Sequence, residues 1–228
     1  MHRHFDDELK LLKEKLLRMS SLAEEAISSS VKALVDRDAN LAAKVIDSDD
    51  AINMLEIEID ELSLRLLALH QPQAGDLRFI TSTMKINNDL ERIGDLAVNI
   101  AQLVKYLMRS PALKSISEVT KMASGAQDML RDSLNAFVNG DSKLAEDVCR
   151  RDDTIDNLNR KIFMDLLDLM LKEKKAVEQA LDLVLVARNL ERIADHSTNI
   201  CEDVIYIIEG KIIKHHIDER ELNKPPQS

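Results

Sequence analysis

The sequence predicts an all-α protein, a tandem duplication of a three-helix bundle with six long helices, and three observations support this fold class. Of the 228 residues, 45% are hydrophobic and 32% are charged, but only 3% are aromatic and none is Trp. Five Gly and four Pro provide few turns, which disfavours a β fold and favours long helices. The phrase L-E-R-I-x-D-x-x-x-N-I begins at Leu90 and again at Leu190, which indicates a duplication.

Apolar spacing predicts the first two helices. From Phe5 to Ala33 the apolar residues recur every three or four positions with one polar lapse, which predicts a helix over residues 3–35. The same rhythm runs from Leu41 to Leu69, again with one lapse, and predicts a second helix over residues 39–70. At 1.5 Å per residue each helix is about 48 Å long.

Breaker residues delimit the next two helices. The segment H-Q-P-Q-A-G at 70–75 ends the second helix, and Asp76 suits the first turn of a third. This third helix is expected to end near Arg109, because Ser110-Pro111 stops it. Ser115 provides an N-cap, with an acid three residues later, and predicts the start of a fourth helix.

Two further turns complete the set of six helices. Asn139-Gly140-Asp141-Ser142 separates the fourth helix from a fifth, and residues 172–175 mark the turn into a sixth. The sixth helix is expected to end near Gly210. The tail over residues 217–228 lacks apolar content and is predicted to be disordered.

The two halves match well beyond the repeated phrase. A shift of 103 residues aligns Met19 with Met122 and Ala23 with Ala126, and the match continues to Asp49 and Asp50. The shift then falls to 100, because the loop at 172–175 is three residues shorter, as expected if length changes occur in loops. We therefore expect one three-helix bundle over residues 1–110 and a second over 111–216. A strict coiled coil is disfavoured by the loops that break the repeat.

Composition excludes several classes of function. The net charge of −10 disfavours nucleic-acid binding and direct binding to an anionic membrane. The start of the sequence has no apolar signal region, and no apolar run approaches the roughly 20 residues that cross a bilayer. Cys149 and Cys201 lie far apart in the sequence and are expected to be reduced core residues. A cytoplasmic protein is the prediction.

Four pairs of acidic or amide side chains, two in each half, lie one helical turn apart. They are Asp49 with Asn53, Glu91 with Asp95, Asp152 with Asp156, and Glu191 with Asp195. Like charges at this spacing cost about 0.2–0.5 kcal/mol per pair. Carboxylates from two neighbouring helices, with water, suit hard cations such as Mg²⁺, Mn²⁺, Ca²⁺ or oxidised iron. The pattern therefore predicts that each half brings its second-helix and third-helix acids together around one or more metal ions.

Other interpretations of the acidic rows are open at this point. Acids on amphipathic helices often form a solvated face, and Arg92 and Arg192 can pair with acids on neighbouring helices. A metal-storage protein or a metal-dependent hydrolase on a helical bundle is the alternative function. No His has Glu three residues before it, no phosphate-binding loop or HExxH motif occurs, and His196 is expected to be a packing or surface residue. We expect a protein that is not an enzyme.

The repeated phrases resemble the PhoU family of phosphate-signalling regulators. The residues that carry the resemblance are N-D-L-E-R-I-G-D from Asn88, N-L-E-R-I-A-D from Asn189, D-D-x-I at Asp49 and at Asp152, and Q-P-x-x-x-D-L-R from Gln71. The resemblance covers roughly residues 5 to 216. It implies two three-helix bundles in a cytoplasmic, often dimeric protein that regulates phosphate uptake negatively.

The resemblance also implies partners and ligands. The expected partners are the ATPase subunit of a high-affinity phosphate ABC transporter and a sensor histidine kinase, with membrane contact only through them. In such families the E/D-x-x-x-D motifs carry metal clusters, and iron, zinc, manganese or magnesium is the expected ion. The positions carried over are the eight residues of the four pairs above. Asn53 departs from the acid that the pattern prefers, so the first-half site is expected to be weaker.

Overall fold

The structure, a computed structural model, describes residues 2–109 and 116–212, and this part of the chain contains helices and no strand. The all-α prediction is confirmed. The long helices are α1 (His2–Asp36), α2 (Ala39–Asp47), α3 (Asp49–His70), α4 (Ala74–Leu107), α5 (Ile116–Asn139), α6 (Ser142–Lys172) and α7 (Val177–Glu209), with a short 3₁₀ turn, η1 (Lys174–Ala176), before α7. The predicted boundary at residues 110–111, the predicted cap at Ser115 and the tail from residue 217 lie outside the described residues.

The helix predicted over residues 39–70 is wrong in one respect, because it is broken at Ser48 into α2 and α3. The Ser48 hydroxyl donates to the carbonyl of Val45 at 2.9 Å, and its backbone N–H donates to Lys44 and Val45. Asp49 and Asp50 follow in the first turn of α3, where negative charge is favourable. The apolar rhythm continues across the break, so periodicity alone does not reveal it. The equivalent helix of the second half, α6, is unbroken.

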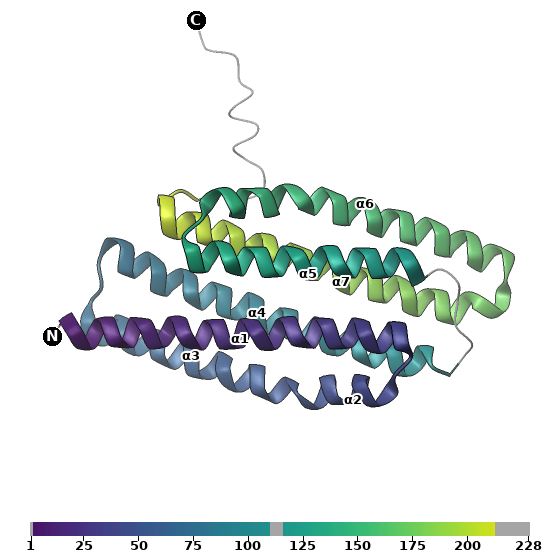
Figure 1. Cartoon of the computed structure of the whole chain (residues 1–228), viewed down its shortest axis with the longest axis horizontal. Coiled ribbons are helices and arrows are strands. Elements are labelled where there is room, and N and C mark those ends of the chain that lie inside the picture. Colours follow the sequence, from purple (N-terminus) through teal and green to yellow (C-terminus); the bar gives the residue numbers. More distant parts are fainter. Residues whose placement is uncertain (1, 110–115, 213–228) are drawn as a thin grey trace, which may run out of the picture.

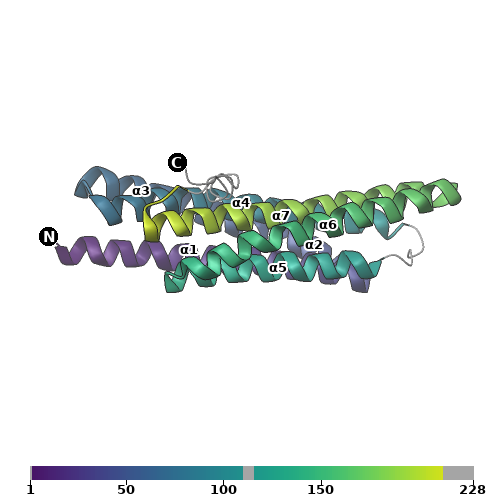
Figure 2. The same ribbon diagram turned by 90° about the horizontal axis from the view of Figure 1, so that it is seen from above.

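The helices form two three-helix halves that lie side by side along the length of the molecule (Figure 1). One half contains α1, α4 and the broken helix α2–α3, and the other contains α5, α6 and α7. The halves meet through α4 against α7 and α1 against α5, and the view from above shows an elongated molecule (Figure 2). Phe79 of α4 also stacks on Phe137 of α5, with ring centroids 5.8 Å apart. One continuous apolar core runs through both halves.

The turns into α2 and α6 show the duplication in atomic detail. Asp38 accepts hydrogen bonds from the backbone N–H groups of Asn40 and Leu41, and Asp141 accepts from the equivalent groups at the start of α6. The preceding residue is left-handed in both copies, with φ of 53° at Arg37 and 62° at Gly140. Gly adopts this conformation without strain, whereas Arg37 does so while donating to the last carbonyls of α4.

The repeated phrase places its apolar residues in the core. Its six Leu and Ile side chains are all fully buried: Leu90, Ile93, Ile100, Leu190, Ile193 and Ile200. These residues fix the rotation of α4 and α7, and so decide which faces the acids occupy. Within the described ranges, none of the helices combines the length and the apolar character needed to cross a membrane.

Candidate functional site

The first acidic cluster, Asp49, Asn53, Glu91 and Asp95, joins the start of α3 to the middle of α4. Burial raises the pKa of Asp49, the hydrogen bond from Asn53 lowers it, and repulsion from Asp95 raises it again. The pKa of Glu91 is raised by burial first, then by Asp95, Glu56 and Asp49. The structure therefore brings the four predicted residues of the first half together, and Glu56 joins them.

A glycine lets the two helices approach at this point. A Cβ atom on Gly94 would lie 2.9 Å from Ile52 Cδ1 and 3.7 Å from Asp49 Oδ1. Asn53 Nδ2 donates to Asp49 Oδ2 at 3.0 Å, while Asp49 Oδ1 is buried and has no hydrogen-bond partner among the described residues. A buried carboxylate oxygen without a donor is costly unless a cation or water satisfies it.

The four residues predicted for the second half, Asp152 and Asp156 on α6 with Glu191 and Asp195 on α7, are called the second acidic cluster. The pKa of Asp195 is raised by desolvation first and then by Glu191 and Asp156, while His196 and Arg192 lower it. Asp195 is exposed to solvent on α7, and Asp156 of α6 is close enough to raise its pKa. Asp152 has a buried Oδ1, as Asp49 has in the first cluster.

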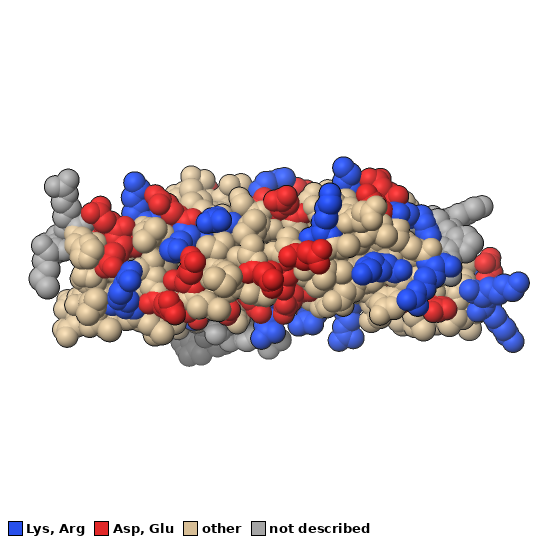
Figure 3. Space-filling model, turned by 90° about the horizontal axis from the view of Figure 1, so that it is seen from below, with Lys and Arg blue, Asp and Glu red and all other residues tan. Residues whose placement is uncertain are grey.

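The donor chemistry of both clusters fits a hard cation, but the side chains do not form a closed metal site. No three described His, Cys, Asp or Glu side chains converge on a point that would hold a metal ion. Arg92 lies 3.6 Å from Glu91 and 4.0 Å from Asp95 on its own helix, so it pairs with these acids and not with a neighbouring helix. Side-chain rotation would be needed to surround an ion. Figure 3, which views the molecule from the side of α2 and α3, shows Asp and Glu gathering along the middle of this face.

A groove of about 990 Å³ between α4 and α7 contains residues that the sequence analysis missed. His196 Nδ1 lies 2.8 Å from Asp89 Oδ1, and Asn199 Nδ2 donates to the same oxygen at 3.3 Å. Asp89 is only 8% exposed. The expectation that His196 is a packing or surface residue is therefore incomplete, because its imidazole contacts a buried carboxylate of the other half.

A second polar contact in this groove also joins the two halves. Lys85 Nζ lies 2.8 Å from Asp203 Oδ1 and 5.7 Å from the centre of the Tyr206 ring. The repeat places Leu185 of α7 at the position of Lys85, and Leu103 of α4 at the position of Asp203. The mismatch between the copies is the sequence signal that could have marked this groove.

The two cysteines are distant in sequence but adjacent in space. Both are free thiols, and Cys201 of α7 is buried while Cys149 of α6 is half-buried. The hydrogen bond between them lowers the pKa of Cys149 and raises that of Cys201, and burial raises the pKa of Cys201 further. The prediction that they are reduced core residues agrees with their free state, but they form a pair and are not isolated.

Comparisons with known proteins agree with the duplicated helices and the placed motifs. The PhoU domain model matches residues 16–104 and again residues 119–204. A protein of Clostridium acetobutylicum named phosphate-specific transport system accessory protein PhoU homolog is 41% identical, covering 91% of this chain and 95% of that protein. A homolog of the same name from Aquifex aeolicus is also 41% identical, covering 93% of this chain and 97% of that protein.

Solved structures show the same fold. The crystal structure of PhoU from Pseudomonas aeruginosa superposes with a TM-score of 0.89 at 38% identity, covering 91% of this chain and all of that one. The phosphate transport system regulatory protein PhoU from Streptococcus pneumoniae gives a TM-score of 0.85 at 32% identity, covering 92% and 100%. The match in each half, the identity over nearly the full length and the shared fold show that this chain belongs to the PhoU family.

Proposed function

We propose that this protein regulates phosphate uptake as an accessory protein of a phosphate transport system. The observation that carries the proposal is the near-complete match, at 41% identity, to proteins named phosphate-specific transport system accessory protein. The chain spans almost the whole length of those proteins, so the proposal concerns the whole molecule and not one module of it. The protein works in the cytoplasm and catalyses no reaction of its own.

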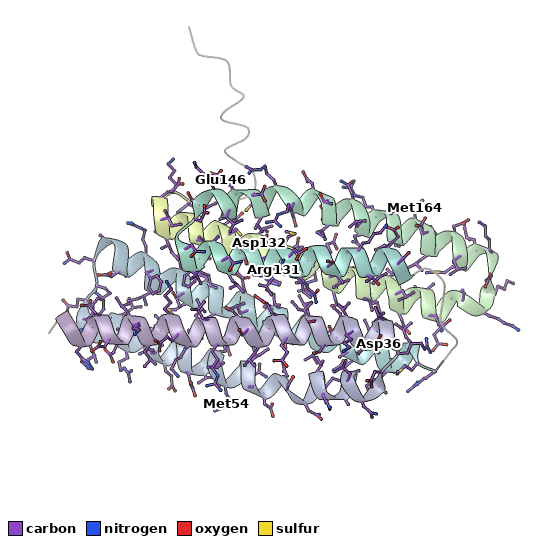
Figure 4. The ribbon with its side chains drawn as sticks, viewed as in Figure 1. Asp36, Met54, Arg131, Asp132, Glu146 and Met164 are labelled. Carbon is purple, nitrogen blue, oxygen red and sulfur yellow. The ribbon has the colours of Figure 1, made fainter. Side chains whose placement is uncertain are left out.

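The adaptor role that we propose needs surfaces for two partners, and the outer helices provide candidates. Met54 on α3 and Met164 on α6 lie at opposite outer edges of the molecule (Figure 4) and are 59% and 61% exposed. Further large apolar side chains are exposed on the same two helices: Ile57 and Leu64 on α3, and Phe163, Leu167 and Leu171 on α6. Exposed apolar side chains grouped on one helix are typical of protein interfaces. In the proposal they contact the ATPase subunit of the transporter and a sensor histidine kinase, and the protein is a homodimer.

The two acidic clusters supply the metal-binding part of the proposal. Asp49, Glu91 and Asp95 would hold an ion in the first half, with Asn53 as a neutral ligand, and the four acids of the second cluster would hold one in the second half. Burial first, and repulsion between the acids second, raise the pKa of Asp49, Glu91 and Asp195. A bound cation, such as iron, zinc, manganese or magnesium, would offset both effects. It would thereby fix α3 to α4 and α6 to α7 and keep the outer surfaces in one geometry.

The regulatory proposal is tested by deletion and rescue in the native cell. When phosphate is plentiful, the protein holds the kinase in its phosphatase-biased state and restrains uptake. Deletion should therefore leave phosphate-responsive genes on in phosphate-rich medium, and the wild-type chain should restore their repression. Unchanged expression in the deletion strain would contradict the proposal.

Partner contact is tested by pull-down at high and low phosphate with matched surface variants. Leu64→Glu on α3 and Leu167→Glu on α6 should each reduce recovery of the transporter ATPase subunit or the kinase. Leu11→Glu on α1 is the control, because Leu11 is exposed to a similar extent as Leu167, 41% against 36%, but belongs to neither α3 nor α6. Equal recovery with all three variants would contradict the placement of the interfaces on α3 and α6.

A further inference from the structure

Polar side chains of α3 and α4 meet beyond the first acidic cluster. Asn87 Nδ2 donates to Asp60 Oδ1 at 3.0 Å and to the carbonyl of Glu56 at 3.0 Å. Ser63 lies one turn beyond Asp60 on α3, and Thr83 lies one turn before Asn87 on α4. We call Asp60, Ser63, Thr83 and Asn87 the polar quartet.

The helix geometry places Ser63 opposite Thr83. The pairs Asp49 with Asp95 and Asp60 with Asn87 show that α3 and α4 run antiparallel, since one number rises as the other falls. Residues three or four apart lie on the same face of a helix. Ser63 lies one helical turn after Asp60 on α3, and Thr83 lies one turn before Asn87 on α4. Because the helices are antiparallel, Ser63 is therefore expected opposite Thr83.

The quartet contains buried oxygens that nothing in the described structure satisfies. Ser63 and Thr83 are 0% exposed and Asn87 is 1% exposed. The atoms Ser63 Oγ, Thr83 Oγ1 and Asn87 Oδ1 have no hydrogen-bond partner among the described residues. A native core rarely leaves three neighbouring polar atoms unsatisfied, and an unseen ion or water is the usual reason.

Four other buried hydroxyls of this protein are satisfied within their own helix, whereas Ser82 Oγ, next to Thr83 on α4, is also buried without a partner among the described residues. Ser20, Ser30, Ser133 and Ser197 each donate to a backbone carbonyl of their own helix, at 2.7–2.9 Å. Such bonds are the ordinary way in which a helix satisfies a buried serine. Ser63 and Thr83 make no such bond among the described residues.

The second half shows that the fold itself does not require these polar groups. Under the shifts of 103 and 100 residues, the quartet corresponds to Phe163, Leu166, Leu183 and Ala187. Leu166 and Leu183 are 1% exposed and belong to the apolar core. The same helix pair is therefore packed with apolar side chains in one copy and lined with oxygens in the other.

We propose that the polar quartet binds one monovalent alkali cation, Na⁺ or K⁺. The four side chains contribute one carboxylate and three neutral oxygens, so a single positive charge balances the site and hard oxygen ligands suit such an ion. Asp60 is half-buried, whereas the other three residues are buried. In the proposal the ion therefore exchanges with solvent past Asp60. The site adjoins the first acidic cluster, since Asn87 donates to the carbonyl of Glu56, but it uses none of the four residues predicted to bind metal there, and it does not depend on the proposed function.

The proposal is tested by thermal unfolding in three chloride salts at one ionic strength, with Na⁺, K⁺ or N-methylglucamine as the cation. The wild type should show a saturable rise in Tm of about 2–4 °C with Na⁺ or K⁺ over N-methylglucamine. Thr83→Val removes one ligand oxygen at nearly constant volume and should abolish the difference between the salts. Ser197→Ala, which removes a buried hydroxyl that is already bonded within its helix, should retain it. Equal Tm values in the three salts would overturn the proposal and leave water in the site.

A second measurement does not depend on the folding of any variant. Crystals of the wild-type chain grown with Rb⁺ or Tl⁺ should show an anomalous peak between Asp60 and Thr83. The variant that copies the second half, Asp60→Phe with Ser63→Leu, Thr83→Leu and Asn87→Ala, should show none. Absence of the peak from the wild type at saturating Rb⁺ and Tl⁺ would overturn the proposal.

Discussion

His196 Nδ1 lies 2.8 Å from Asp89 Oδ1 and thereby links α7 of the second half to α4 of the first. Both side chains are largely buried, with 17% and 11% of the side chain exposed. In the repeat, Leu96 of α4 corresponds to His196, and Asn189 of α7 corresponds to Asp89. The two copies have therefore diverged at their contact, and one side of the interface carries a polar link that the other lacks.

Removing the imidazole should destabilise the protein, because the Asp89 carboxylate would keep only its weaker contact with Asn199. We expect His196→Leu to cost about 2 kcal/mol in the free energy of unfolding, measured by urea denaturation at pH 7. The double variant Asp89→Asn with His196→Leu copies the pair at Leu96 and Asn189 and should recover most of that loss. A double variant that is as unstable as the single one would contradict the buried carboxylate as the cause.

Neutralising Glu91 should stabilise the metal-free protein. Its pKa is raised above the ordinary value of 4.5, so between 4.5 and the raised value the folded state binds more protons than the unfolded state. Stability from this group therefore falls as pH rises through that window, and the full penalty is present at neutral pH. In a chelator, Glu91→Gln should be more stable than the wild type at pH 7 by about 0.5 kcal/mol.

The pH dependence provides the control for the Glu91 prediction. Below pH 4.5 the wild-type side chain is protonated in both states, so the gain of Glu91→Gln should disappear there. Urea unfolding of the two proteins across this pH range measures the difference directly. A gain of the same size at every pH would show that the negative charge of Glu91, with its burial and its repulsion from Asp95, is not the source of the gain.

Gly94 is predicted to accept a side chain only at a cost in stability. The added Cβ of Gly94→Ala would lie 2.9 Å from Ile52 Cδ1 and 3.4 Å from Ile52 Cγ2, so the buried Ile52 side chain beside Asp49 must shift. We expect a loss of about 1–3 kcal/mol in urea unfolding, as is typical of overpacked cores. Gly75→Ala is the matched control, since a Cβ there meets nothing within 4 Å, and it should be neutral or slightly stabilising. Equal stability of the two variants would contradict the close approach at Gly94.

Periodicity and duplication were sufficient to predict most of the fold and the approach of acids on α3 and α6 to those on α4 and α7. Metal binding by these acids stays a prediction. The apolar residues of the repeated phrase set the rotation of α4 and α7, so Glu91 and Glu191 had to lie towards the neighbouring helix. The break at Ser48 could not be predicted, because a helix interruption that preserves the apolar face leaves the spacing unchanged. The contact of His196 with Asp89 depends on the register of α4 against α7, which no local pattern contains.

The polar quartet illustrates the same limit. Thr83 and Asn87 are read as ordinary polar positions in a single copy, and their meaning depends on which residues of α3 lie opposite them. Comparison of the copies gives the missing information, since Leu183 and Ala187 occupy these positions in the second half. Differences between the halves mark specialised sites, just as agreement between them marks the shared architecture.

Cation binding by the two acidic clusters is tested most directly by metal analysis after equilibrium dialysis of untagged protein against Fe³⁺, Zn²⁺, Mn²⁺ or Mg²⁺. The wild type should retain at least one ion per half for one of these metals. Glu91→Ala with Asp95→Ala should lose the first-half ion and keep the second, and Glu191→Ala with Asp195→Ala should do the reverse. A wild-type chain that retains no stoichiometric metal, or variants that retain as much as the wild type, would show that the acidic rows are only solvated faces.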